Sequence, residues 1–201
     1  MNGLYARVPR VCVSLSAQSR GVRLKWYREH GNRTVSDWGN VMFTDESRFD
    51  LEPDDKRIRI WRKQGTRNQP QNITQHHAFR GRSIMVWAGI SLGYRTDLHI
   101  FKWDSVRAVR HRDEVLEPIV RLYAAAVGPT FVLMDDNARP YRTDIVDDYL
   151  ESEGIARMAW PAYSPDLNPI GNFWDALGRA VSSRLTPPAT LIELETALQE
   201  E

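Results

Sequence analysis

Residues 130–137, which read Thr-Phe-Val-Leu-Met-Asp-Asp-Asn, are the stretch that decides the fold of this chain. Four apolar residues run directly into two carboxylates, and a short apolar run of this kind is typical of a buried central strand. Asp135 and Asp136 then lie at its carboxyl end, where open α/β sheets place their ligands. Because neighbouring side chains of a strand point to opposite faces, only one of the two can face a given site. The same pair could instead begin a turn or cap the next helix, and this stretch alone leaves both interpretations open.

A second stretch of the same kind lies upstream. Residues 41–47 read Val-Met-Phe-Thr-Asp-Glu-Ser, so apolar residues again run into acids, and we expect Asp45 at a strand end. Residues 57–61 alternate strictly between basic and apolar side chains, which predicts a half-buried strand with one basic face. Further strands are predicted by short apolar runs at residues 48–51, 83–90, 98–103 and 155–160.

Helices are predicted between and after these strands. Residues 115–127 have helical spacing, and Pro118 either starts that helix or kinks it. Near the end of the chain, Asn168 is a natural N-cap with Pro169 at the first helical position. The other predicted helices cover residues 19–28, 145–150, 170–181 and 190–201. Strands first, and then helices alternating with strands, predict an α/β fold with a mixed sheet and helices on its faces.

Composition and charge narrow the class of protein. A chain of 201 residues can bury one proper core plus an extension. Cys12 is the only cysteine, which excludes an internal disulfide and a cysteine-based zinc site, and no apolar run approaches membrane length. Residues 1–33 hold seven Lys or Arg against one acid, a net of +6; because the whole chain carries +1, the remainder carries −5. A basic arm on a mildly acidic body predicts a polyanionic partner, although it could also be merely solvated.

The two acids suggest a specific chemistry. Aspartates at the ends of two buried strands are good ligands for a hard cation, and Mg²⁺ is usually held by one or two carboxylates together with substrate phosphates. Two such ions about 3.5 to 4 Å apart can activate a hydroxyl and stabilise the leaving oxygen of a phosphodiester. The basic arm, and a polar and basic segment at residues 62–82, would hold a nucleic acid; for that segment a plain solvated loop is equally compatible with the sequence.

Three motifs carry a family resemblance. They are Phe-Thr-Asp-Glu-Ser-Arg-Phe at residues 43–49, Met-Asp-Asp-Asn-Ala-Arg-Pro at 134–140, and Trp-Pro-Ala-Tyr-Ser-Pro-Asp-Leu-Asn-Pro-Ile at 160–170. Over nearly the whole chain they resemble the catalytic domain of Tc/mariner-superfamily DNA transposases. The resemblance implies a ribonuclease H-like fold in which two aspartates and a third acid bind Mg²⁺ or Mn²⁺, cut transposon ends and join them to target DNA. Carried across, the two aspartates are Asp45 and Asp136.

This chain departs from the family pattern at two positions. In the glutamate branch the third acid lies thirty-five positions after the second aspartate, which here is Gly171, so the metal site is expected to lack one carboxylate and to be weakened. The helix is expected to be weakened too, since Glu at this third helical position could close a capping box. Tyr141 stands where the family usually has histidine. The acids near enough in sequence to substitute for the third ligand are Asp135, Asp166 and Asp175.

The resemblance also implies a domain organisation and partners. We expect residues 1–38 to be a basic linker and 39–201 a DDE-type catalytic domain that is truncated at its C-terminus, with helix-turn-helix modules missing before it. The expected partner is DNA, in the nucleus, with no membrane and no small-molecule cofactor; the oligomeric state stays open, a homodimer included. The residues expected to contact DNA are Arg7, Arg10, Arg20, Arg23, Lys25, Arg62, Lys63 and Arg67.

Three functions remain open on the sequence. The first is a transposase catalytic domain whose chemistry has decayed with the loss of an acid at position 171. The second is a working metal-dependent strand transferase with an unorthodox third ligand. The third is a DNA- or protein-binding module that keeps the fold without the chemistry.

Overall fold

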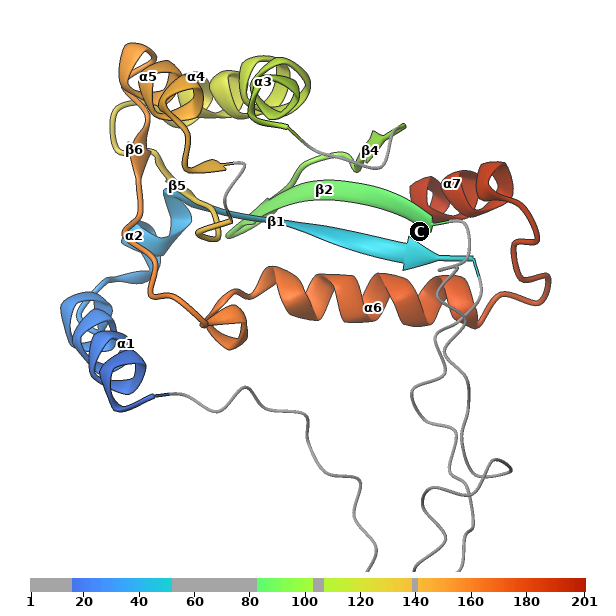
Figure 1. The fold of residues 1–201 in the computed structure, drawn as a ribbon, viewed down its shortest axis with the longest axis horizontal. Coiled ribbons are helices and arrows are strands. Elements are labelled where there is room, and N and C mark those ends of the chain that lie inside the picture. Colours follow the sequence, from blue (N-terminus) through green and yellow to red (C-terminus); the bar gives the residue numbers. More distant parts are fainter. Residues whose placement is uncertain (1–15, 52–82, 103–106, 139–140) are drawn as a thin grey trace, which may run out of the picture.

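A central mixed sheet organises the fold (Figure 1). The computed structural model describes residues 16–51, 83–102, 107–138 and 141–201. In this part of the chain the sheet has the strand order β3-β2-β1-β5-β6, with β4 also paired to β2; β1 is antiparallel to β2 and parallel to β5. The strands are β1 (Val41–Asp50), β2 (Ser83–Ser91), β3 (Tyr94–Arg95), β4 (His99–Phe101), β5 (Val132–Met134) and β6 (Ala156–Arg157).

Strand β1 is longer than the sequence indicates. The prediction that it ends at the acids around Asp45, with a new strand at residues 48–51, is wrong, because one strand runs from Val41 to Asp50. Its antiparallel pairing with β2 extends from Phe43 to Asp50, whereas its parallel pairing with β5 stops at Phe43. Asp45 therefore lies inside β1, just past the point where one neighbouring strand ends. The predicted strand at residues 57–61 and the basic segment at 62–82 lie outside the described residues.

Helices cover both faces of the sheet (Figure 1). Helices α3, η2, α4 and α5 lie over one face, and α6 lies under the other, with α7 against α6 and β2. Within the described ranges, none of the helices has the length and apolar character that crossing a membrane requires. The helices are α1 (Ala17–His30), α2 (Val35–Gly39), α3 (Ala108–His111), η2 (Arg112–Val120), α4 (Arg121–Val127), α5 (Asp144–Ser152), η4 (Pro165–Leu167), α6 (Ile170–Ser182) and α7 (Leu191–Glu200).

Side-chain alternation along the strands separates the two cores. Trp87 of β2 is buried with Met42 of β1 beneath the α3–α5 face, while the next residues of β2 on either side, Val86 and Ala88, pack with Trp174 of α6. This is the expected consequence of a pleat that directs successive side chains to opposite faces. Any residue of β1 or β5 can therefore be assigned to one face from its parity.

The predicted helix at residues 115–127 is the end of a longer helical segment. Helices α3, η2 and α4 follow one another without a break from Ala108 to Val127. Pro118 lies inside η2, which is π-helical. Proline lacks an N–H and clashes with the preceding turn of an α-helix, so a locally wider helix accommodates it. Of the two alternatives for Pro118, the structure shows a local distortion rather than a helix start.

An aromatic cluster fixes helix α1 to the edge of the sheet. Trp26 of α1 contacts Trp160 edge to face at a centroid distance of 5.0 Å and Trp38 at 6.3 Å, and Trp38 stacks on Phe43 of β1 at 5.9 Å. Aromatic pairs of this geometry add to the stabilisation that comes from apolar burial. The basic helix expected at residues 19–28 is thus present within α1, and it is docked rather than extended away from the body.

The burial of η2 against the sheet gives a stability test. Leu116 is 1% exposed in the core beneath α3–α5, whereas Leu122, one and a half turns later, is 57% exposed. We expect Leu116→Ala to lower the free energy of unfolding by about 2–5 kcal/mol, because it leaves a cavity in a packed core. Leu122→Ala is the matched control and should change it by less than about 0.5 kcal/mol. Urea denaturation followed by circular dichroism measures both, and equal effects would contradict the assigned helix face.

Candidate active site

The register between β1 and β5 brings two aspartates together. The strands pair in parallel with Val41 opposite Val132 and Phe43 opposite Met134. Asp45 and Asp136 each lie two residues beyond that last pair, so they share one level and one face of the sheet. This is the carboxyl end of β5, the place where α/β sheets of this kind bind their ligands. The two acids, distant in sequence, are thus brought together by a strand pairing.

The two aspartates open into one cleft, with a volume of about 570 Å³. Gly171, near the start of α6, lines the same cleft, so the position at which the family resemblance implies a third acid shares this cleft with Asp45 and Asp136. A Cβ atom added at Gly171 would meet no heavy atom of the described residues within 4 Å outside its own helix. A longer side chain at position 171 therefore has room to extend. The rest of the cleft is lined by Asn137, Ala138, Trp160, Pro161, Ala162, Tyr163, Ser164, Pro165 and Asn168.

Burial and mutual repulsion perturb the acids. The pKa of Asp45 is raised to about 6, first by burial and then by the charge of Asp136, while hydrogen bonds from the Glu46 backbone and the Trp174 side chain lower it. Trp174 Nε1 donates to Asp45 Oδ2 at 3.3 Å, and the backbone N–H of Ala138 donates to Asp136 Oδ1 at 2.9 Å. Two repelling carboxylates that line one cleft form a site that a cation would stabilise.

The donor set fits a hard divalent cation only in part. Two carboxylates supply the oxygen ligands that Mg²⁺ and Mn²⁺ prefer. Within the described ranges, no cluster of three or more His, Cys, Asp or Glu side chains is arranged to hold a metal ion. Asp45 and Asp136 can therefore hold such an ion together with substrate oxygens, and the protein gives it no third carboxylate from position 171.

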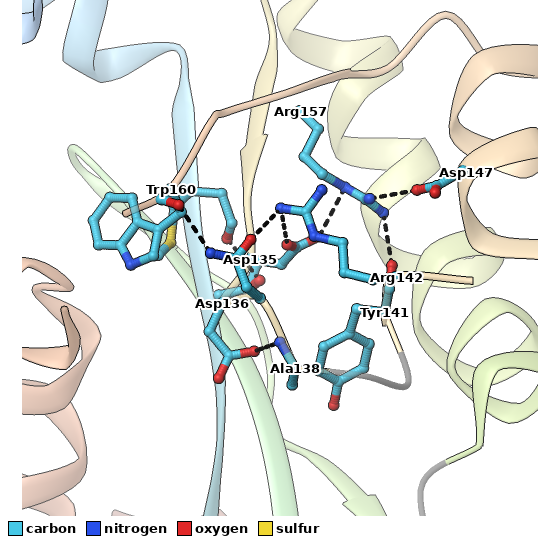
Figure 2. Close-up of polar contacts among 11 residues, drawn as sticks. Asp135, Asp136, Ala138, Tyr141, Arg142, Asp147, Arg157 and Trp160 are labelled. Atoms are coloured by element: carbon cyan, nitrogen blue, oxygen red, sulfur yellow. Dashed lines mark hydrogen bonds and ion pairs between the residues drawn. The ribbon is translucent and has the colours of Figure 1, made fainter. Parts of the chain in front are cut away.

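Asp135 faces away from the cleft (Figure 2). It is only 6% exposed, and its carboxylate lies 3.0 Å from Arg157 Nε and 3.6 Å from Arg142 Nη2. Burial raises the pKa of Asp135 to about 6, against the charges of Arg157 and Arg142, which lower it. Arg157 also donates to Asp147 at 2.5 Å and to the carbonyl of Tyr141 at 3.2 Å. Asp135 thus takes part in an ion-pair network on the opposite face of the sheet.

The other two candidate substitutes also have defined positions. Asp166 accepts two hydrogen bonds from Arg23 of α1, at 2.7 and 2.6 Å. Asp175 is exposed on α6 and is not among the described residues that line the cleft. Arg23, expected at the DNA, is therefore engaged with Asp166 in this structure.

Of the other expected DNA contacts, only part of the set lies in the described region. Arg20 and Lys25 are exposed on α1, where Lys25 lies 3.7 Å from Glu29. Those outside the described residues are Arg7, Arg10, Arg62, Lys63 and Arg67.

Asn168 links the start of α6, which carries Gly171, to strand β1. Its Nδ2 donates to the carbonyl of Thr44 at 3.1 Å, and its Oδ1 accepts from the N–H of Ile170 at 3.3 Å. The N-cap of α6 is Pro169, one residue later than predicted, but the Asn168 side chain still satisfies an N–H of the first turn. Gly171 is accordingly the second helical residue rather than the third. Asn168 is buried, so the start of α6 is held at a fixed position relative to Asp45.

Glu46 and Tyr141 form a contact that sequence reasoning missed. The pKa of Glu46 is raised to about 8, chiefly by burial, while a hydrogen bond with the Tyr141 side chain lowers it. The Tyr141 ring packs on His111 at a centroid distance of 4.3 Å. Strand parity places Glu46 on the face opposite to Asp45, and this was the one available signal that it is not a third ligand. Tyr141, at the position where the family usually has histidine, supports Glu46 from that face.

Solved structures with a similar arrangement identify the class of fold. A Mos1 mariner paired-end complex with manganese matches with a TM-score of 0.70 at 18% identity, covering 98% of this chain and 59% of that chain. The catalytic domain of Mos1 mariner transposase matches with a TM-score of 0.59 at 15% identity, covering 93% of this chain and 83% of that chain. The sheet with its flanking helices is a ribonuclease H-like fold.

Sequence relatives identify the family. Residues 40–192 match the family model described as DDE superfamily endonuclease. The Tcb2 transposase of Caenorhabditis briggsae is 33% identical over 180 residues, which cover 89% of this chain and 65% of the relative. The Tc1 transposase of Caenorhabditis elegans is 28% identical over 181 residues, covering 88% and 64%. The chain spans just under two thirds of the length of these relatives, and it belongs to the DDE endonuclease superfamily as a Tc/mariner-type transposase catalytic domain.

The ion pair behind the site gives a stability test. Arg157→Met leaves the buried Asp135 carboxylate without its nearest cation, and we expect it to lower the free energy of unfolding by about 3–5 kcal/mol. The double variant Arg157→Met with Asp135→Leu should recover most of that loss, because no buried charge remains. Arg112→Met, which removes the exposed pair with Asp113, is the control and should leave the free energy of unfolding nearly unchanged. Urea denaturation at pH 7 measures all three; a double variant as unstable as the single one would refute the pairing.

Buried His111 predicts a pH dependence. Burial, and then the charges of Arg157 and His99, lower the pKa of His111 from 6.5 to about 3. Between these values the unfolded chain binds a proton that the folded chain excludes, so His111 makes the free energy of unfolding fall as the pH falls through this window. The slope is at most about 1.4 kcal/mol per pH unit. His111→Phe keeps a ring against Tyr141, and in denaturation between pH 4 and 7 it should show a shallower slope. An unchanged slope would assign the acid sensitivity to other groups.

Proposed function

We propose that this chain is a metal-dependent DNA strand-cleaving and strand-joining domain in which Asp45 and Asp136 bind Mg²⁺ or Mn²⁺. One observation carries the proposal: the strand register sets these two acids at one level and on one face, and they open into a single cleft. Membership of the DDE endonuclease superfamily supports the assignment. The Mos1 structures to which the fold is similar include forms with Mg and with Mn.

The residues of this chain position the reaction and do little covalent chemistry themselves. A bound divalent ion would neutralise phosphodiester charge and activate a hydroxyl or water. Trp174 and the Glu46 backbone donate to Asp45, and the N–H of Ala138 donates to Asp136, so both carboxylates are held by fixed donors. Both residues line the cleft. Phosphoryl transfer depends mainly on such positioning and charge neutralisation, which is the type of catalysis that this site can supply.

Gly171 makes the site weaker than a site with three acids. The candidates for substitution do not favour a rescue, because Asp135 is paired with Arg157, Asp166 is paired with Arg23 and Asp175 is exposed on α6. The space at position 171 is open, and a carboxylate there would be the third acid of the proposed metal site. We propose that the chain binds metal poorly and cleaves DNA slowly for this reason.

DNA is the proposed partner, and the nucleus the proposed compartment. The Mos1 structures include complexes with transposon ends, and the relatives are transposases. In this chain the exposed basic residues Arg20, Lys25 and Arg28 lie on α1, which the aromatic cluster docks beside the cleft. Exposed basic groups on this docked helix would contact the phosphate backbone of a bound strand. A homodimer also remains a proposal.

The decisive experiment restores the missing acid. We expect Gly171→Glu to increase the rate at which supercoiled plasmid DNA is nicked in Mn²⁺ by on the order of 10²-fold. Mutation of residues that only support the metal ligands already alters activity by about 10–100-fold, and a restored ligand should have at least as large an effect. Mn²⁺ affinity, measured by electron paramagnetic resonance of the free ion, should increase in parallel. The matched control is Gly171→Gln, which also replaces the glycine that weakens the helix but adds no carboxylate. It should behave like the natural chain.

A second control removes the proposed ligand on the other strand. Asp45→Asn combined with Gly171→Glu should nick no DNA, which excludes a contaminating nuclease. Nicking by the natural chain at the rate of Gly171→Glu would overturn the proposed impairment. Absence of nicking in every variant, together with DNA binding that weakens steeply with salt, would favour a binding module instead.

A further inference from the structure

Tyr163 combines an unusual backbone with an exposed ring beside the two acids. It lies in the cleft-lining segment at residues 160–165, and Asp45 and Asp136 line the same cleft. Among the described residues, Tyr163 is the non-glycine residue with positive φ, at 56°, and it is 70% exposed. A bulky residue in this left-handed region costs roughly 1–2 kcal/mol, so the surrounding structure must impose the conformation.

The contacts around Tyr163 impose that conformation. Arg23 of α1 donates to the carbonyl of Tyr163 at 3.4 Å while its guanidinium is held by two bonds to Asp166. On the other side, the buried Ser164 donates to the carbonyl of Ala162 at 3.2 Å. Prolines at 161 and 165 fix two further φ angles of the segment. The rigid segment thus keeps the ring exposed to solvent, and the ring does not fold back onto the core.

The segment that carries Tyr163 is mostly apolar and differs in chemistry from the two acids that line the same cleft. Its neighbours in the cleft are Pro161, Ala162 and Pro165, and Trp160 is largely covered by Trp26 and Phe43. Asp45 and Asp136 supply the acidic part of the lining. A ligand that fills this cleft needs an anionic part for the acid-bound cation and a flat apolar part for the tyrosine. A nucleotide meets both requirements, with its phosphate toward the acids and its base toward the ring.

We propose that Tyr163 stacks on an unpaired nucleobase next to the phosphodiester that Asp45 and Asp136 bind. The inference rests on the proposed function, since it specifies how the DNA substrate enters the same site. A base inside a duplex presents no free face, so the ligand class is a single-stranded or unpaired nucleotide at or near a DNA end. The contact is made by the π-face and needs no hydroxyl, because base stacking on aromatic side chains tolerates any base and any ring of this size.

The test uses a DNA duplex with a short single-stranded end that carries 2-aminopurine, whose fluorescence falls when it stacks. Fluorescence anisotropy of a separate dye on the duplex measures binding of the full chain in Mn²⁺. We expect the natural chain and Tyr163→Phe to quench 2-aminopurine to the same extent. Tyr163→Leu should lose the quenching and bind about tenfold more weakly, in line with a single lost base stack.

Two further variants separate the ring from the strained backbone. Tyr163→Gly removes the ring and relieves the positive φ; it should unfold at a higher urea concentration than the natural chain and still lose the quenching. Tyr94→Leu, at a half-exposed tyrosine on β3 outside the residues that line the cleft, should leave quenching and binding unchanged. Loss of quenching in Tyr163→Gly despite higher stability would support a contact with the base and exclude a purely structural role.

The outcomes distinguish this inference from the proposed function. DNA binding that depends on Asp45 and Asp136, with 2-aminopurine quenching unchanged in Tyr163→Leu, would overturn the stacking contact and leave the proposed function intact. Absence of DNA binding by the natural chain in Mn²⁺ would overturn both. Equal loss of quenching in Tyr163→Phe and Tyr163→Leu would assign the contact to the hydroxyl group and would also overturn base stacking.

Discussion

The parallel register of β1 against β5 is the constraint on which the rest of the site depends. Because Phe43 pairs with Met134, Asp45 comes level with Asp136 and both face α6. A slip of one residue in β5 would turn Asp135 toward the cleft and Asp136 toward Arg157, since side chains alternate between faces. The register is fixed on both sides of the sheet: Leu133 is buried under the α3–α5 helices, and Met134 is buried in the cluster around Trp160. Apolar burial therefore decides which aspartate can act as a ligand.

Two adjacent aspartates consequently have opposite electrostatic surroundings. Asp135 lies against a cation that the protein itself supplies, the guanidinium of Arg157. Asp136 lies opposite another acid, Asp45, and its nearest donor is one backbone N–H. The first arrangement is already neutralised and resists a further cation, whereas the second has an excess of negative charge next to solvent. This difference is the reason why Asp135, although it is one residue away, is not proposed as a substitute for an acid at position 171.

The sequence predicted the local parts of this arrangement, and long-range contacts account for what it missed. Apolar runs located β1, β2 and β5, and the family motifs pointed to Asp45, Asp136 and position 171. The continuation of β1 to Asp50 was missed because acids that follow an apolar run resemble a strand end. The strand continues because it pairs with the antiparallel strand β2 as far as Asp50. The pairings of Arg23 with Asp166 and of Asn168 with the carbonyl of Thr44 connect residues more than 120 positions apart. No local periodicity carries that information.

Helix α1 shows how the fold combines two interactions that respond differently to salt. Its position beside the cleft depends on Trp26 against Trp160 and Trp38, and such apolar contacts are little affected by ionic strength. The carbonyl of Trp160 in turn accepts a hydrogen bond from Asn137, the residue after Asp136. The charges of α1, by contrast, act on a polyanion through electrostatic interactions. Salt at 0.1 M largely screens such interactions beyond about 10 Å. Raising the salt concentration would therefore weaken the proposed attraction of α1 for DNA more than it weakens the aromatic contacts that dock the helix, so its geometry and its electrostatics can be tested separately.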